Sequence, residues 1–151
     1  MTKEEMHQDY LTIYGMNAPL PKKAIMLGGL LSCYEETWRV VGITEEALKV
    51  FKKHDFKSAS KMGINRAHKV HRITTYKEML SIKMEIESWW AYYIKHDTTI
   101  LSTSSENRRH VFSKTIIIDE QLGLFKSRGF KWRHGRDEIS FLKKEYDNLN
   151  L

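Results

Sequence analysis

The sequence contains a single cysteine, Cys33, and this scarcity excludes several classes of protein. One cysteine forms no internal disulfide and cannot supply a cysteine-rich zinc cluster. No apolar run approaches the roughly 20 residues that a membrane-spanning helix requires, and the residues after Met1 lack the apolar core of a signal peptide. We therefore expect a cytoplasmic protein that has no membrane partner.

Two motifs of common enzymes are also missing. The sequence has no glycine-rich phosphate loop of the Walker or dinucleotide pattern, and it has no Gly-x-Ser-x-Gly turn. These absences argue against nucleotide hydrolases and serine hydrolases.

Apolar residues make up 41% of the 151 residues and aromatic residues 11%, which is typical of a folded chain rather than a disordered one. This length suits one ordinary domain, and no internal repeat or linker divides the chain. We therefore expect a single domain over residues 1–151.

Positive charge is in excess, with a formal net charge of +6, and it is concentrated in two segments. The segment from Lys49 to Arg72 contains eight Lys or Arg residues and one acidic residue. The segment from Arg108 to Arg136 contains eight Lys or Arg residues and two acidic residues. Such clusters attract phosphate groups and release counterions when they bind them. We expect nucleic acid as the partner, with DNA favoured. The alternatives are a basic surface that is only solvated, and binding to an acidic protein or a membrane.

Hydrophobic spacing and cap residues predict an α+β fold, a mostly helical single domain with a small β-hairpin or sheet. The strongest pattern spans residues 75–95, where apolar residues recur at steps of three and four. Further helices are expected over residues 3–13, 22–41, 44–53, 105–110 and 136–149, and strands near 64–73, 98–103 and 114–119.

The first candidate site lies in the segment 65–72, where two histidines, His68 and His71, alternate with basic residues. The positive charge of Lys69 and Arg72 disfavours a metal ion held by these histidines alone. One histidine that activates a water molecule near a bound phosphate fits the pattern better. The alternative is a pair of exposed histidines on a basic strand.

The second candidate site follows the strand predicted at 98–103. If Ser105 caps the next helix, Asn107 and His110 share one helix face beside Glu106. These side chains offer oxygen and nitrogen ligands for a divalent ion, and Arg108 and Arg109 are free to bind phosphate. The alternative is a capped helix with surface Arg and His residues and no further role.

The segment Leu101–His110 resembles the end of the HNH, or His-Me finger, endonuclease motif of phage type. In that family a histidine activates water and a divalent ion binds the scissile phosphate. The resemblance implies His68 as the general base and Mg²⁺ or another divalent cation held by Asn107, His110 and Glu106. We place Arg66 in the same catalytic set, as a residue that contacts the phosphate. Ala67 stands where the family commonly has Asp or His. A competing register uses the pair His96 and Asp97 but leaves too short a middle loop.

The third candidate site is the segment 125–136, where basic residues alternate with Phe and Trp. Such mixtures are typical of surfaces that bind phosphates and stack on bases, and the alternative is a loop anchored in the core. The residues that we expect to contact nucleic acid here are Lys126, Arg128, Lys131, Trp132, Arg133 and Arg136. Lys69, Arg72, Arg108 and Arg109 complete the predicted nucleic-acid surface.

These patterns lead to one functional hypothesis and two alternatives. The leading hypothesis is a small, basic, metal-dependent endonuclease that cleaves DNA phosphodiester bonds, such as a phage encodes. The first alternative is a nucleic-acid-binding protein without catalysis, such as a regulator or an accessory of replication or recombination. The second is an interaction protein that uses its basic face against an acidic protein. The oligomeric state stays open, with a homodimer as one option.

Overall fold

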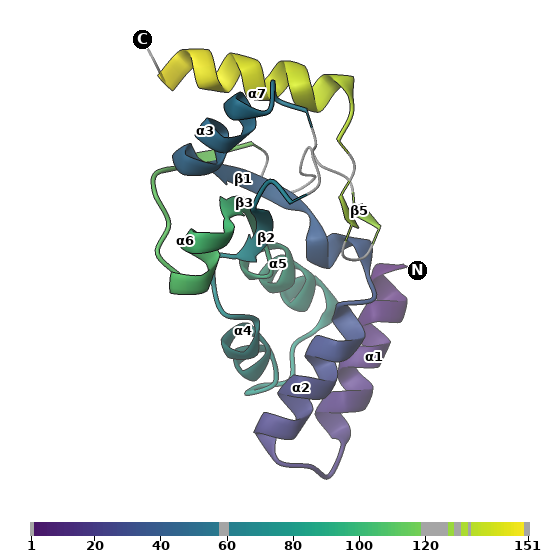
Figure 1. Cartoon of the computed structure of the whole chain (residues 1–151). Coiled ribbons are helices and arrows are strands. Elements are labelled where there is room, and N and C mark those ends of the chain that lie inside the picture. Colours follow the sequence, from purple (N-terminus) through teal and green to yellow (C-terminus); the bar gives the residue numbers. More distant parts are fainter. Residues whose placement is uncertain (1, 58–60, 119–126, 129–130, 133, 150–151) are drawn as a thin grey trace.

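The computed structural model describes residues 2–57, 61–118, 127–128, 131–132 and 134–149 (Figure 1). The described residues form seven α-helices and a four-stranded mixed sheet, so the expected α+β, mostly helical fold is confirmed. Within these ranges, no helix combines the length and the apolar character needed to span a bilayer.

The sheet has the strand order β2-β3-β1-β4 and contains both parallel and antiparallel pairs. Its strands are β1 (Val40–Thr44), β2 (Ile64–His68), β3 (Thr99–Thr103) and β4 (Thr115–Ile117). The pair β1–β3 is parallel, whereas β2–β3 and β1–β4 are antiparallel. In the β2–β3 pair His68 lies opposite Thr99 and Ile64 lies opposite Thr103.

Four helices gather at one end of the molecule and share an aromatic core (Figure 1). They are α1 (Lys3–Gly15), α2 (Leu20–Leu31), α4 (Arg72–Met79) and α5 (Ile86–His96). Tyr10 and Trp89 are fully buried here, and their rings stack at 5.6 Å. A capping box between Thr2 and Glu5 begins α1, since it satisfies free backbone N–H groups of the first turn.

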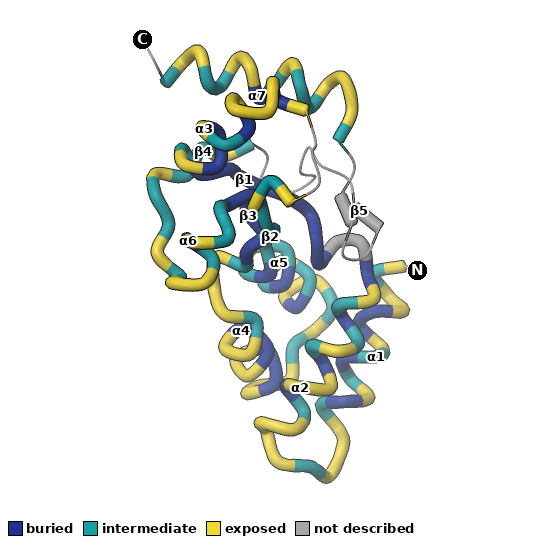
Figure 2. The backbone as a smooth tube through the Cα atoms, viewed as in Figure 1, coloured by how far each residue is buried: buried dark blue, intermediate teal, exposed yellow. Residues whose placement is uncertain are grey.

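The other helices pack around the sheet. The helices α3 (Glu45–Lys53) and α7 (Arg136–Leu149) lie together at the opposite end and share a core with the sheet that includes Leu101 and Leu142 (Figures 1 and 2). A smaller cluster of Val41, Ala67 and Ile100 packs against Phe112, just after the short helix α6 (Ser104–Arg109). The remaining elements are the 3-10 helix η1 (Glu35–Trp38) and the strand pair β5 (Ser127–Arg128) and β6 (Lys131–Trp132).

One expectation is wrong at the end of the predicted helix 22–41. The helix ends at Leu31, and the residues from Val40 to Thr44 form β1 in the interior of the sheet. All five residues of β1 are buried, so the strand has no alternation of buried and exposed residues to reveal it. Gly42 lies inside this strand, and the position suits glycine because an added Cβ would lie 2.9 Å from the carbonyl oxygen of Ile116.

Two other boundaries differ from expectation. The strand predicted over 64–73 ends at His68, and the helix predicted over 75–95 is two helices, α4 and α5. The break over residues 80–85 interrupts a regular apolar pattern because Tyr10 of α1 contacts it. The Tyr10 hydroxyl donates to the carbonyls of Met79 and Ile82 and accepts from the backbone N–H of Met84. The helices near 3–13, 44–53, 105–110 and 136–149 and the strands near 98–103 and 114–119 are confirmed.

Candidate functional site

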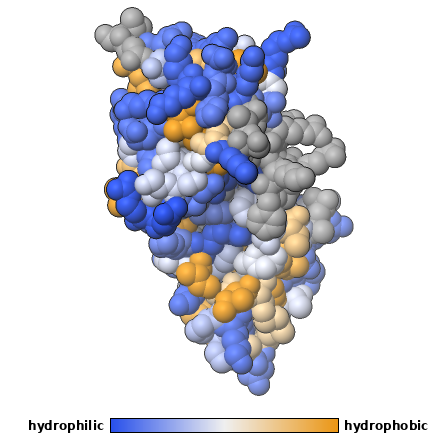
Figure 3. Space-filling model, viewed as in Figure 1, coloured by the Kyte–Doolittle hydropathy of each residue, from blue (hydrophilic) through white to orange (hydrophobic). Residues whose placement is uncertain are grey.

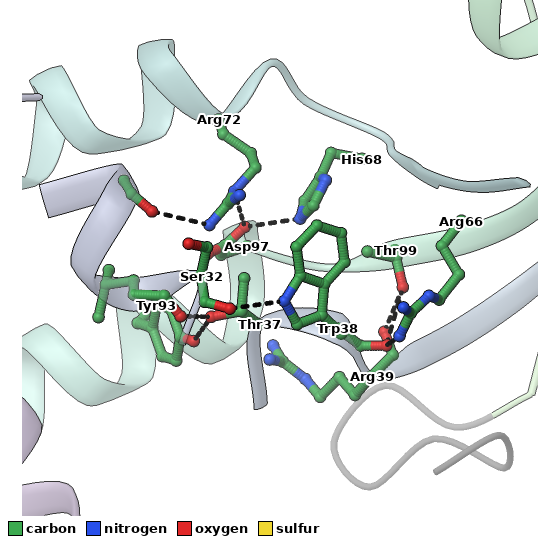
Figure 4. A network of polar contacts seen from close by, with 12 residues as sticks. Ser32, Thr37, Trp38, Arg39, Arg66, His68, Arg72, Tyr93, Asp97 and Thr99 are labelled. Carbon is green, nitrogen blue, oxygen red and sulfur yellow. Dashed lines mark hydrogen bonds and ion pairs between the residues drawn. The ribbon is translucent and has the colours of Figure 1, made fainter. Parts of the chain in front are cut away.

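A buried carboxylate, Asp97, lies where the ends of β2, α4 and α5 meet (Figure 4). Its side chain is 0% exposed and contacts three side chains. Its Oδ2 accepts a 2.7 Å hydrogen bond from the Tyr76 hydroxyl. Its Oδ1 lies 3.2 Å from Nε2 of His68 and 3.6 Å from Nε of Arg72. A single acid therefore joins the end of a strand to two helices.

The local structure explains why these groups meet. The β2–β3 register places His68 opposite Thr99, two residues after Asp97. Arg72 and Tyr76 are four residues apart on α4 and so share one helix face. The Arg72 Nε donates to the Tyr76 hydroxyl at 2.7 Å. Burial, followed by the negative charge of Asp97, raises the pKa of Tyr76, so Tyr76 stays a neutral donor.

Trp38, at the end of η1, forms one wall of this site. The His68 ring meets the indole edge to face at 5.5 Å, and the guanidinium of Arg72 lies 5.3 Å from the ring centre. The indole Nε1 donates to the carbonyl of Ser32 at 2.9 Å, which fixes the orientation of the ring (Figure 4). Arg66 covers the indole at 4.9 Å.

Arg66 is partly buried and contacts Trp38 twice. Its guanidinium donates to the Trp38 carbonyl at 3.2 Å and also lies over the indole ring. Burial lowers the pKa of Arg66 to about 10, which leaves the side chain charged at neutral pH. Arg66 therefore supports the Trp38 wall and keeps a positive charge close to His68.

His68 has the geometry of an oriented acid-base group. Its side chain is 12% exposed, and its Nε2 lies 3.2 Å from Oδ1 of Asp97 in a contact that is not aligned as a hydrogen bond. Nδ1 lies on the other side of the ring, away from Asp97 (Figure 4). A carboxylate on one nitrogen selects the tautomer that leaves the other nitrogen free to accept a proton. Such contacts often tighten only when substrate binds.

The second predicted site is arranged differently from the expectation. The Glu106 carboxylate is buried, and both of its oxygens accept hydrogen bonds. Its Oε2 accepts from the Thr44 hydroxyl at 2.8 Å and from the Thr103 backbone and side chain, and its Oε1 accepts from the Ser113 backbone and side chain. Burial raises the pKa of Glu106, but the bonds from Ser113, Thr103 and Thr44 outweigh burial and lower it overall. Glu106 thus stabilises the start of α6.

His110 and His68 lie on different sides of the sheet. Arg66 and His68, two residues apart on β2, both face Trp38, whereas Ala67 faces the opposite side and packs with Phe112. His110 contacts Phe112 at 5.1 Å and stacks on His71 at 4.0 Å. The structure therefore brings His110 to His71 and not to the Asp97 side of His68.

The predicted metal ligands do not fit a divalent ion in this arrangement. Glu106 is committed to five hydrogen bonds, and His110 lies against a second imidazole and follows two arginines. Among the described residues, no group of three or more His, Cys, Asp or Glu side chains is placed to hold a metal. Asn107 is half-buried at the end of α6, and its backbone carbonyl accepts from the backbone N–H of His110.

The predicted nucleic-acid contacts fall into four groups. Lys69, Arg108, Arg109 and Arg136 are exposed, and Arg72 is half-buried in the site around Asp97. Lys126 and Arg133 lie outside the described residues, and Arg128, Lys131 and Trp132 are described only as parts of β5 and β6. On the face shown in Figure 3, hydrophilic residues prevail toward α3, α6 and α7, and hydrophobic ones gather toward α2 and α4. The exposed apolar residues of these two helices include Ile25, Met26 and Ile73.

The sequence did not identify Asp97, Trp38 or Tyr76 as site residues. Asp97 entered only as the neighbour of His96 in a competing register. Asp97 follows an amphipathic helix and comes two residues before the strand β3. This position is a usable signal for a site residue, because the end of a strand paired with β3 then lies close to Asp97. Trp38 carries no such signal, since it lies in the stretch that was predicted as helix.

In comparisons with protein-family models, curated proteins and solved structures, nothing matches this chain.

Proposed function

We propose that this protein cleaves phosphodiester bonds in nucleic acid, with His68 as the general base. The observation that carries the proposal is the 3.2 Å contact between Nε2 of His68 and the fully buried carboxylate of Asp97. A buried carboxylate of this kind orients an imidazole and stabilises the imidazolium that forms when it takes a proton. The net charge of +6 and the two basic segments favour a polyanionic substrate.

The chemical step assigns a role to each nitrogen of His68. Nδ1 takes a proton from a water molecule while the water oxygen attacks phosphorus. The bond from phosphorus to one ester oxygen breaks, and that oxygen leaves with a proton from the solvent or from the His68 imidazolium. Asp97 keeps the ring in place and balances its transient charge.

The surrounding cations supply phosphate binding. Lys69 is exposed and directly follows His68, and Arg72 is half-buried with its guanidinium beside Asp97. Positive groups that are already fixed stabilise the extra charge of a phosphorane-like transition state without reorganising. Trp38 contacts the His68 imidazole, and Arg66 lies over the Trp38 indole.

Metal dependence stays a prediction that rests on the family resemblance. The set Glu106, Asn107 and His110 does not fit a metal as arranged, so no step of this mechanism is assigned to one. Cleavage measured in Mg²⁺, in Mn²⁺ and in EDTA distinguishes metal-dependent cleavage from cleavage that needs no cation. Activity that survives EDTA supports general-base catalysis by His68 without a cation, whereas activity that needs a cation supports the metal-dependent form of the proposal.

The test is a cleavage assay on supercoiled plasmid, single-stranded DNA and RNA. Wild type is compared with His68→Ala, Asp97→Asn and the control His54→Ala, whose histidine is exposed at the end of α3. We expect a loss of at least about 100-fold in His68→Ala, the scale of one acid-base residue. We also expect a smaller loss in Asp97→Asn and none in His54→Ala. No cleavage by wild type under any of these conditions would overturn the proposal.

A second function is supported by a separate observation. Lys69, Arg108 and Arg109 are exposed, and none of them forms an ion pair with an acid of the described residues. Uncompensated surface cations are typical of proteins that bind nucleic acid without cleaving it. Binding that weakens steeply with salt, without any cleavage, would favour this alternative.

A further inference from the structure

Two histidines from distant parts of the sequence stack on each other outside the site of Asp97. His71 precedes α4 and His110 follows α6, and their ring centres are 4.0 Å apart with an angle of 19° between the planes. Phe112 adds a third ring, edge to face with His110 at 5.1 Å. Figure 1 shows the end of α6 beside the loop that joins β2 to α4. His71 is exposed and His110 is half-buried, so the stack reaches the surface.

The backbone at His110 favours a role for its ring. His110 ends α6 in the left-handed conformation, with φ at 51°. Glycine or asparagine is the usual residue at such a position because other side chains are strained there. The chain instead places an imidazole there, and that imidazole lies flat against His71.

The surroundings of the histidine stack suit a strand of nucleic acid. Lys69, Arg108 and Arg109 are exposed nearby in sequence, and none is paired with an acid of the described chain. The nearest acid in sequence, Glu106, is buried and bound to Ser113, Thr103 and Thr44. Rings for stacking beside cations for phosphates are the two parts of a site that binds unpaired nucleotides.

We propose that the His71–His110 stack is a platform for an unpaired base and that the substrate of this protein is therefore single-stranded nucleic acid. The inference rests on the proposed function, since it specifies the substrate of the same site. His71 lies three residues after His68 and directly before Arg72, so the loop that carries the platform joins the strand end and the helix start that hold two residues of the Asp97 site. A base in a duplex is already stacked on its neighbours, and it cannot lie against His71 without leaving the helix.

Asparagine substitutions test the platform without disturbing the fold. His71→Asn places a preferred helix-capping residue before α4, where His71 makes no side-chain cap, and His110→Asn suits the left-handed position. His71→Phe keeps a ring and removes the imidazole nitrogens. His54→Asn is the matched control at the end of α3.

Binding is measured by fluorescence anisotropy in EDTA with three probes: a single strand, the same sequence as a duplex, and an abasic single strand. Each probe has about 20 nucleotides, a length that exceeds the usual single-strand binding site. A denaturing gel confirms that each probe stays intact. For wild type we expect the single strand to bind at least about tenfold more tightly than the abasic strand, the scale of one base stacked on a ring. The asparagine variants lose this preference, whereas His71→Phe and His54→Asn keep it.

Three outcomes would overturn the inference. They are equal binding of the single and abasic strands by wild type, tighter binding of the duplex than of the single strand, and loss of the preference in His71→Phe as well as in His71→Asn. These readouts do not depend on cleavage. If the protein binds the single strand through its bases but cleaves nothing, the result supports the base platform and refutes only the proposed cleavage.

Discussion

The buried carboxylate of Asp97 lies 3.2 Å from Nε2 of His68, and its other oxygen accepts a 2.7 Å hydrogen bond from Tyr76. Because Asp97 ends α5, His68 ends β2 and Tyr76 belongs to α4, one side chain fixes the relative position of three elements. The same contact serves stability and the proposed chemistry. The two roles are separable by measurement, and the stability role gives the first prediction.

Replacing Asp97 with asparagine lowers the free energy of unfolding by about 3 kcal/mol, since it leaves the Arg72 charge without its buried partner. Urea denaturation followed by circular dichroism measures the change. Asp55→Asn is the control, because Asp55 is exposed at φ 53°, a conformation that asparagine adopts readily. We expect that control to change stability by less than about 0.5 kcal/mol. Equal stabilities of the two variants would contradict the buried-network interpretation.

Glu106 makes the folded state sensitive to acid. Burial raises the pKa of Glu106, and the bonds from Ser113, Thr103 and Thr44 outweigh it, so the folded pKa lies below the ordinary value of 4.5. A carboxylate whose pKa is lower in the folded state stabilises the protein at pH values above its pKa in the unfolded chain. That stabilisation is lost as the pH falls through its pKa in the folded state.

We expect Glu106→Gln to cost about 2 kcal/mol of unfolding free energy at about pH 7, because charged hydrogen bonds are replaced by weaker ones. The difference from wild type narrows as the pH falls below about 4.5. Thermal denaturation across the acidic range up to neutral pH checks both statements. The control is Glu46→Gln, an exposed partner of Lys49, which changes stability by less than about 1 kcal/mol. If the difference in unfolding free energy between wild type and Glu106→Gln stays constant over the whole pH range, the charge of Glu106 does not contribute to stability.

Two adjacent glycines of α2 give opposite predictions. A Cβ at Gly28 would lie 2.8 Å from a ring carbon of the buried Tyr76, whereas a Cβ at Gly29 meets nothing within 4 Å. Gly29→Ala therefore stabilises the protein by up to about 1 kcal/mol through helix propensity. Gly28→Ala destabilises it by about 1 to 3 kcal/mol, because it displaces Tyr76 from Asp97. Chemical denaturation of both variants tests the packing of α2 on α4, and a stabilising Gly28→Ala would contradict it.

Sequence reasoning recovered the elements that have clear local signals. The helix from Arg136 to Leu149 and the strand from Thr99 to Thr103 were predicted nearly to the residue, since caps and regular spacing define them. The strand β1 was missed because a fully buried strand has no alternation. The break over residues 80–85 was missed because Tyr10, some 70 residues earlier, satisfies its backbone groups. Contacts this distant leave no local pattern.

The site was predictable only in part, and for the same reason. His68 and Arg72 attracted attention because histidine and basic residues gather in one segment, and the structure joins both to Asp97. Asp97 itself stands alone between a helix and a strand, and only the pairing of β2 with β3 brings it to His68. The pairing of His71 with His110 likewise depends on the return of α6 toward the end of β2.

Chemical rescue of His68→Ala tests the central claim most directly. Removing the ring leaves space beside Asp97 that an imidazole molecule from solution can enter, and a free base restores catalysis only where the missing group acted as one. We predict that His68→Ala cleaves single-stranded nucleic acid at least about 100-fold more slowly than wild type, and that added imidazole recovers part of the rate while wild type is unaffected. Cleavage by His68→Ala at the wild-type rate, or a rate equally low with and without imidazole in a correctly folded variant, would contradict the assignment of His68 as the general base.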